Sequence, residues 1–183
     1  MERYADALLE AVRDTEYAAV QVRRAAVQAL QPECGDVDEY LQADAVALVD
    51  ITEQGYLNIT LPVMMPQRKE GDWARFLSGP IRSAVTAYFQ ERPLPRFEVC
   101  VLVYEHIYDR NSRRRFVDHD NLELKHCQDL LENYFLVNDS SSLCSAFQCS
   151  HRGDRTATRI WILRPEQFRE WLDDHPECWL GTP

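Results

Sequence analysis

An alternating segment between Phe97 and Ile107 constrains the fold of this chain more than any other feature. Apolar residues occupy alternate positions along it, at Phe97, Val99, Val101, Val103 and Ile107. Because successive side chains of a β-strand point to opposite faces, this pattern predicts a strand with one apolar face. Any fold of this chain must therefore contain a β-sheet.

Weaker patterns on both sides of this strand predict helices and further strands. The expected elements are helices over 4–31 and 36–47, strands over 46–51 and 56–61, a helix from Pro80 to about residue 92, a helix over 120–134, strands over 143–149 and 156–163, and a short helix after Pro165. This order predicts the α/β class: a small mixed α+β domain (strand-helix-strand-helix-strand-strand) with a helical extension before it. We expect residues 1–54 to form the acidic, mainly helical extension and residues 55–183 to form the domain.

The charge distribution bears on possible partners. The chain has 20 basic and 30 acidic residues, a net charge of −10, which by itself argues against nucleic acid. Residues 1–60 hold four arginines against twelve acidic residues, a net of −8, so the remainder is close to neutral. That remainder contains a basic run at Arg110, Arg113, Arg114 and Arg115, which are candidate DNA contacts.

Neither the apolar segments nor the N-terminus suggests a membrane protein. No window approaches 18 consecutive apolar residues, and the first residues are acidic rather than basic and then apolar. We therefore expect a cytoplasmic protein with no membrane partner. Six cysteines without a C-x-x-C pair are then expected to be buried thiols, and Cys149-Ser-His151 supplies two metal ligands, too few for a site.

Asp118 and Asp120 are candidate ligands for a divalent cation. They lie two residues apart, where a loop meets the helix expected over 120–134. Mg²⁺ prefers oxygen ligands, is commonly held by one or two carboxylates, and keeps several waters. Beside a phosphodiester, such an ion generates the attacking hydroxide and neutralises the leaving oxygen. The simpler alternative is that Asp120 only caps the helix.

A longer pattern resembles the RusA family of Holliday junction resolvases. Asp118-His119-Asp120-Asn121-Leu122 matches a D-x-D-N-L motif of that family, and Asp139 follows Asp120 by the 19 residues that separate its second acidic motif. Thr60-Leu61-Pro62 is similar to the end of the family's first strand, and residues 143–163 are similar to its terminal two-strand hairpin. The resemblance covers roughly residues 56–164.

The resemblance implies a site and an activity. Asp118, Asp120 and Asp139 would bind Mg²⁺, with Mn²⁺ as the alternative ion, and Lys125 would be the catalytic lysine that stabilises charge on the phosphate. The implied protein is a homodimeric endonuclease that cleaves branched DNA in recombination or repair, on a mobile element. A two-fold dimer suits a four-way junction, which has the same symmetry.

Two departures from the family support an alternative function. Asn138 replaces the first of two adjacent acids at the second motif, and Lys125 comes one residue later than in the family, a turn of about 100° on a helix. The alternative is an inactive RusA-like protein that binds DNA or another protein. Asp139 either returns to Asp118 within one chain, which we favour, or serves the site of a partner subunit.

Overall fold

The computed structural model describes residues 47–68, 73–90, 92–113, 115–138 and 140–180. The chain divides into two compact units, residues 1–45 and 46–183, and the described residues belong to the second. The helix expected over 4–31 lies outside the described residues, as does the helix expected over 36–47 except for Ala47, which is not helical. The boundary falls after residue 45, rather than 54, because the strand Leu48–Ile51 pairs with the strand Leu57–Leu61.

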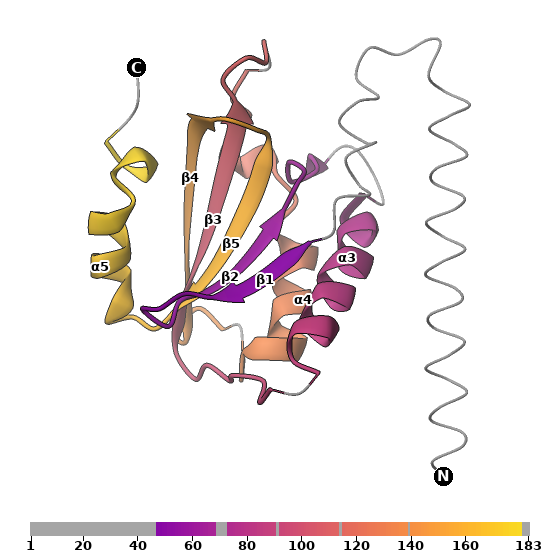
Figure 1. The fold of residues 1–183 in the computed structure, drawn as a ribbon, viewed down its shortest axis with the longest axis vertical. Helices are drawn as coiled ribbons and strands as arrows, with labels where there is room; N and C mark the ends of the chain where they lie inside the picture. The colour runs from indigo at the N-terminus through magenta and orange to yellow at the C-terminus, as the bar shows by residue number, and fades with distance from the viewer. Residues whose placement is uncertain (1–46, 69–72, 91, 114, 139, 181–183) are drawn as a thin grey trace. The chain divides into compact units, whose positions relative to one another are not determined.

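A five-stranded mixed sheet forms the centre of the domain (Figure 1). Its strands are β1 (Leu48–Ile51), β2 (Leu57–Leu61), β3 (Cys100–Asp109), β4 (Cys144–Gly153) and β5 (Ala157–Leu163), in the spatial order β1-β2-β5-β3-β4. β3 runs parallel to β4 and antiparallel to β5, and the remaining pairs are antiparallel. The coarse prediction of a small mixed α/β domain is therefore confirmed.

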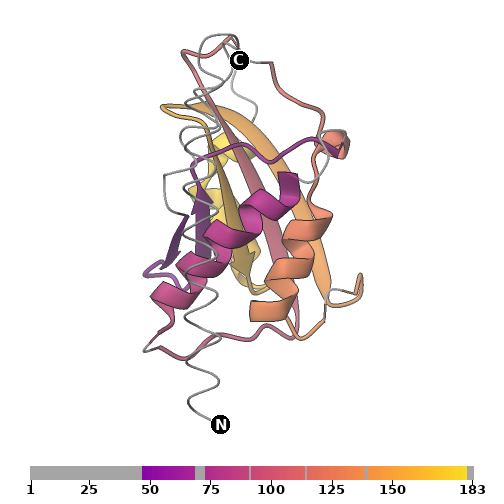
Figure 2. The same ribbon diagram turned by 90° about the vertical axis from the view of Figure 1, so that its right-hand side faces the viewer.

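Helices cover both faces of this sheet, as Figures 1 and 2 show. α3 (Trp73–Tyr88) and α4 (Lys125–Phe135) lie on one face, and α5 (Gln167–Asp174) and the 3₁₀ turn η4 (Pro176–Cys178) lie on the other. The alternation along β3 divides the core: Leu102 and Tyr104 pack with α4, whereas Val101 and Val103 pack with Trp171 of α5. Because both faces are covered, nearly every side chain of β3 is buried.

The prediction that residues 143–163 form a two-strand hairpin is wrong, because β3 lies between β4 and β5. The chain leaves β4 at Gly153 and crosses the end of β3 before it enters β5. A Cβ atom on Gly153 would lie 2.5 Å from Cγ2 of Ile107, so the crossing needs a residue without a side chain. The backbone N–H of Arg110 donates to the Gly153 carbonyl at 2.9 Å and fastens the crossing to β3.

Pro80 does not begin a helix, as the sequence suggested, but lies inside α3. A residue before proline is normally excluded from the helical region by a clash that involves its Cβ. Gly79 precedes Pro80 and has no Cβ, so the helix continues through this position. Among the described residues, no helix is long and apolar enough to cross a membrane.

Candidate functional site

Asp118 and Asp120 lie on either side of His119, which contacts the C-terminal halves of the parallel strands β3 and β4. The 3₁₀ turn η3 (His119–Asn121) holds Asp120, and Asp118 is the residue before it. His119 anchors this turn to the sheet, since its Nε2 lies 2.9 Å from Oγ of Ser150 in β4. The sheet therefore positions the two carboxylates, although a loop carries them.

The D-x-D-N-L segment does not open α4 as expected. Leu122 leaves the turn with an extended backbone (ψ 140°) and is buried in the core, and the N–H of Glu123 donates to the Pro66 carbonyl. α4 begins afterwards, at Lys125. The burial of Leu122 therefore separates η3 from α4, and Asp120 does not cap that helix.

Both carboxylates are available to a cation. Asp118 and Asp120 are exposed, and within the described part of the chain no side chain forms a hydrogen bond or an ion pair with either. Two carboxylates with open solvent around them suit Mg²⁺, which keeps most of its waters. The residues present therefore fit the ion that the sequence resemblance implies.

Two histidines support this turn, and the sequence patterns did not reveal them. His119 is half-buried, and its ring lies 5.6 Å from the ring of the buried His106. Burial and the neighbouring His119 lower the pKa of His106 to about 4, so its ring is neutral at physiological pH. The alternation of β3 could have indicated the burial of His106, since it shares a face with Leu102 and Tyr104.

Lys125, the predicted catalytic lysine, is the first residue of α4 and is exposed. Its backbone N–H donates to the Glu123 side chain at 3.1 Å. It lies on the same chain segment as Asp118 and Asp120, after residues 122–124, which separate η3 from α4.

Asp139, the third predicted carboxylate, lies outside the described residues. The chain on either side of it is found at the other end of the sheet: Val137 donates its N–H to Phe97, and Leu143 accepts from the N–H of Cys100. Cys100 and His106 are six residues apart along β3, about 20 Å. The described neighbours of Asp139 thus lie far from η3 of the same chain.

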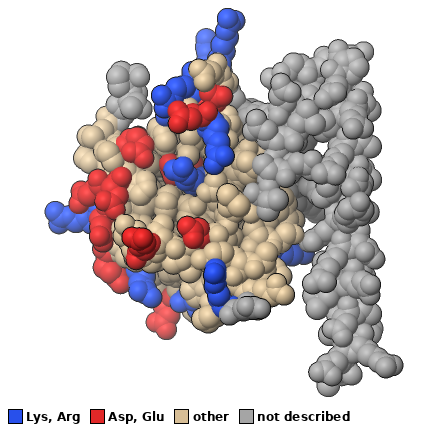
Figure 3. All heavy atoms as spheres, viewed as in Figure 1, with Lys and Arg blue, Asp and Glu red and all other residues tan. Residues whose placement is uncertain are grey.

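The arginine-rich loop, residues 110–117, connects β3 to η3. Arg113 and Arg115 are exposed, Arg110 pairs with Asp154 at 2.9 Å, and Arg114 lies outside the described residues. Figure 3 shows basic side chains gathered at this end of the domain, with acidic ones between them. The loop therefore carries exposed cations on the chain segment that leads to the two carboxylates.

Aromatic packing holds the base of this loop. The rings of Tyr108 and Phe116 meet edge to face with centroids 4.8 Å apart, and the Tyr108 hydroxyl accepts the N–H of Val117 at 3.0 Å. The Arg152 guanidinium lies 5.0 Å from the Phe116 ring and donates to the Asp109 carbonyl. This guanidinium is thus used to hold the loop, and sequence reasoning did not single it out.

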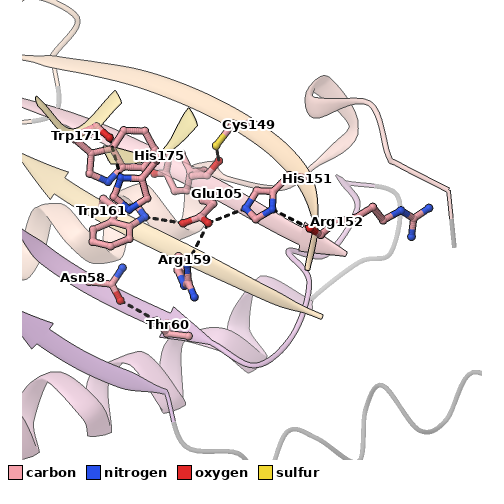
Figure 4. A network of polar contacts seen from close by, with 11 residues as sticks. Asn58, Thr60, Glu105, Cys149, His151, Arg152, Arg159, Trp161, Trp171 and His175 are labelled. Atoms are coloured by element: carbon pink, nitrogen blue, oxygen red, sulfur yellow. Dashed lines mark hydrogen bonds and ion pairs between the residues drawn. The ribbon is translucent and has the colours of Figure 1, made fainter. Parts of the chain in front are cut away.

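A second cluster of ionisable groups lies on the opposite face of the sheet, which α5 and η4 cover. Figure 4 shows its polar contacts from close by. The fully buried carboxylate of Glu105 accepts hydrogen bonds from Nε2 of His151 (2.8 Å), the guanidinium of Arg159 (3.2 Å) and the indole of Trp161 (2.9 Å). These residues come from β3, β4 and β5. Sequence patterns could place Glu105 on the same face as Val103, but they could not reveal its partners.

The charges of this cluster follow from its contacts. Burial raises the pKa of Glu105, but the hydrogen bond from His151 and the charge of Arg159 outweigh it, and the pKa lies below its usual value. Hydrogen bonds with Cys178 and Glu105 raise the pKa of His151 to about 10. Glu105 is therefore ionised and His151 protonated at neutral pH when no metal is bound.

Comparison with known proteins identifies a family but no activity. The model of a family described as a family of unknown function (DUF6100) matches residues 1–179. No curated protein matches the chain.

Proposed function

We propose that this chain, which belongs to the DUF6100 family, is a Mg²⁺-dependent endonuclease that cleaves branched DNA. One observation carries the proposal: Asp118 and Asp120 lie exposed and unpaired among the described residues, on the chain segment that follows the arginine-rich loop. The resemblance of the D-x-D-N-L segment to RusA resolvases supplies the substrate class. A cytoplasmic role in DNA recombination or repair, on a mobile element, follows from the same resemblance.

Each part of the site has a distinct task in this reaction. The two carboxylates would hold Mg²⁺, which supplies a metal-bound nucleophile and neutralises the leaving oxygen when bound. Arg113 and Arg115 would hold the DNA backbone next to the scissile phosphate. Lys125 would stabilise charge that develops on that phosphate.

A homodimer would complete the site. The described neighbours of Asp139 lie about 20 Å along the sheet from η3, so the partner subunit is the better source of a third carboxylate. A two-fold dimer also places two sites symmetrically, as the cleavage of two opposing strands of a junction requires. We therefore favour the arrangement in which Asp139 acts on the site of the other subunit.

Cleavage of a labelled four-way junction tests the activity. The substrate is compared with a linear duplex of the same sequence, with Mg²⁺, with Mn²⁺ and with chelator. We expect paired nicks near the crossover, and a loss of at least about 100-fold in rate for Asp118→Asn and for Asp120→Asn. Asp173→Asn, an exposed acid on α5, is the matched control and should cut as the wild type does.

The binding arm of the experiment separates the alternatives. A gel-shift measurement of the same junction reports affinity whether or not cutting occurs. Binding without cutting, with either metal ion, would refute the nuclease and favour a non-catalytic DNA-binding protein, as Asn138 in the second motif suggests. A protein that fails both to bind and to cut the junction would overturn both functions.

Mixing two inactive variants tests the origin of the third carboxylate. If Asp139 acts across the dimer, a heterodimer of Asp118→Asn and Asp139→Asn chains keeps one intact site. Random pairing makes half of the dimers heterodimers, and each heterodimer has one intact site out of two. About a quarter of all sites are then intact, so the mixture recovers about a quarter of the wild-type rate. If each site takes all three carboxylates from one chain, the mixture stays inactive, which would overturn the arrangement across the dimer.

A further inference from the structure

Four side chains with metal-binding atoms converge between the sheet and the C-terminal turn. They are Glu105 of β3, His151 of β4, and Glu177 and Cys178 of η4, and their ligand atoms all lie within 4.8 Å of one another. Glu105, His151 and Cys178 are buried, and Glu177 is half-buried. The cluster lies on the α5 face of the sheet, whereas the aspartates of η3 follow the end of β3, so it is distinct from the nuclease site proposed above.

The ligand set points to zinc. A thiolate, an imidazole and two carboxylates make four ligands of the kinds that bind Zn²⁺, and structural zinc sites are almost always tetrahedral with four protein ligands. At Zn–ligand distances of 2.0–2.3 Å, the ligand atoms of a tetrahedron lie about 3.3–3.8 Å apart. The atoms of this cluster need only side-chain adjustments to reach that spacing.

Two of the ligands already form hydrogen bonds through atoms that would not bind the metal, as is common in metal sites. Zinc-binding histidines commonly use their second ring nitrogen to contact a backbone carbonyl, and ligating carboxylates are hydrogen-bonded in turn. Here Nδ1 of His151 lies 3.3 Å from the Arg152 carbonyl, while Nε2 faces Glu105. The Trp161 indole donates to Oε2 of Glu105, while Oε1 faces His151 and also accepts a hydrogen bond from the Arg159 guanidinium, which would lie behind a bound ion (Figure 4).

We propose that Glu105, His151, Glu177 and Cys178 bind a structural Zn²⁺ ion, which fastens the C-terminal turn η4 to the sheet. In the absence of metal, a proton joins Nε2 of His151 to Glu105. Zinc replaces that proton and the thiol proton of Cys178, and both protons leave to solvent. Since all four positions are filled by the protein, the ion has no open site for a substrate.

Metal binding to the full-length chain tests this proposal without reference to DNA cleavage. The purified protein is stripped with a chelator. One sample is titrated with Zn²⁺ and a second with Co²⁺, which has visible absorption bands in tetrahedral sites. We expect one Zn²⁺ per chain, and a Co²⁺ complex with tetrahedral bands and a thiolate-to-cobalt charge-transfer band. No stoichiometric binding, or a Co²⁺ spectrum without the thiolate band, would overturn the proposal.

Matched cysteine variants identify the thiolate. Cys178→Ala should abolish the charge-transfer band, and Cys127→Ala, which removes a buried thiol on the other face of the sheet, should keep it. Equal loss in both variants, or retention in both, would contradict the assignment. Circular dichroism of each variant shows whether it folds.

Glu177 provides a variant that should fold normally, because it is half-buried and lies outside the sheet. Glu177→Gln should weaken Zn²⁺ binding at least tenfold, whereas Glu166→Gln, an exposed residue before α5, should leave it unchanged. An unchanged Zn²⁺ affinity in Glu177→Gln would show that Glu177 is not a ligand and would overturn the four-ligand site. Asp118→Asn should keep full Zn²⁺ binding, which distinguishes the zinc site from the proposed Mg²⁺ site.

Discussion

Replacing Gly153 with alanine tests how the chain crosses from β4 to β5. The new Cβ would lie 2.5 Å from Cγ2 of Ile107, whereas two carbon atoms in ordinary contact lie about 3.5–4.0 Å apart. The overlap is at least about 1 Å, and the β-branched Ile107 side chain is stiff and buried, so it cannot rotate away. We expect Gly153→Ala to lower the free energy of unfolding by about 1–3 kcal/mol.

A double-mutant cycle with Ile107→Ala isolates this clash. Ile107→Ala alone should cost about 2–5 kcal/mol, because it removes a buried side chain, and it also removes the Cγ2 atom that Gly153→Ala would meet. In that background Gly153→Ala should cost nearly nothing. Unfolding by urea gives the four free energies, and in thermal melts the single Gly153→Ala change should lower Tm by about 2–12 °C.

Gly55→Ala is the matched control for this cycle. Gly55 has a φ of 79°, which disfavours alanine, but a Cβ there would meet only ordinary contacts. Its cost should therefore be the same with Ile107 or with alanine at position 107. If the Gly153→Ala cost also stays unchanged in the Ile107→Ala background, the steric explanation of the crossing is refuted.

Three further measurements test the two sites. Trp161→Phe removes the indole donor to the buried Glu105 carboxylate and should cost about 1.5–3 kcal/mol in urea unfolding; no change would mean that this hydrogen bond contributes little. Arg113→Ala and Arg115→Ala should each weaken junction binding, and each should reduce the slope of log binding constant against log salt concentration by about 1. Arg169→Ala on α5 should do neither. Equal effects of all three variants would argue against the loop as the DNA contact. Zinc at 100 times its Kd should stabilise the stripped protein by about 2.7 kcal/mol, or about 5–11 °C in Tm, and an unchanged Tm would contradict a structural ion.

Sequence patterns identified most of the elements but not all of their limits. The alternation that predicted strands over 56–61, 97–107 and 156–163 corresponds to β2, β3 and β5, because the two-residue period of a strand is a local property. The predicted start of α3 at Pro80 was wrong because Gly79 lets the helix continue through Pro80. The helix expected from residue 120 begins at Lys125 because the core buries Leu122.

Local patterns do not contain the strand order. Residues 143–163 read as a hairpin, since two strands joined by a short turn usually pair. β3 instead pairs with both β4 and β5, so that a strand with nearly all of its side chains buried lies inside the sheet with a neighbour on each side. Only the packing of the whole domain decides between these arrangements.

The sequence by itself determined the strands, the exposed aspartates of the D-x-D-N-L motif and the arginine-rich loop, because each depends on residues close together in the chain. It also identified Cys149 and His151 as two possible metal ligands, but the strand expected there ended at residue 149, whereas β4 continues to Gly153 and so contains His151. Only the tertiary structure brought Glu105 and Cys178 to His151, from 46 and 27 residues away. Strand pairing and the return of η4 to the sheet create that cluster, and both are non-local contacts that no short pattern encodes.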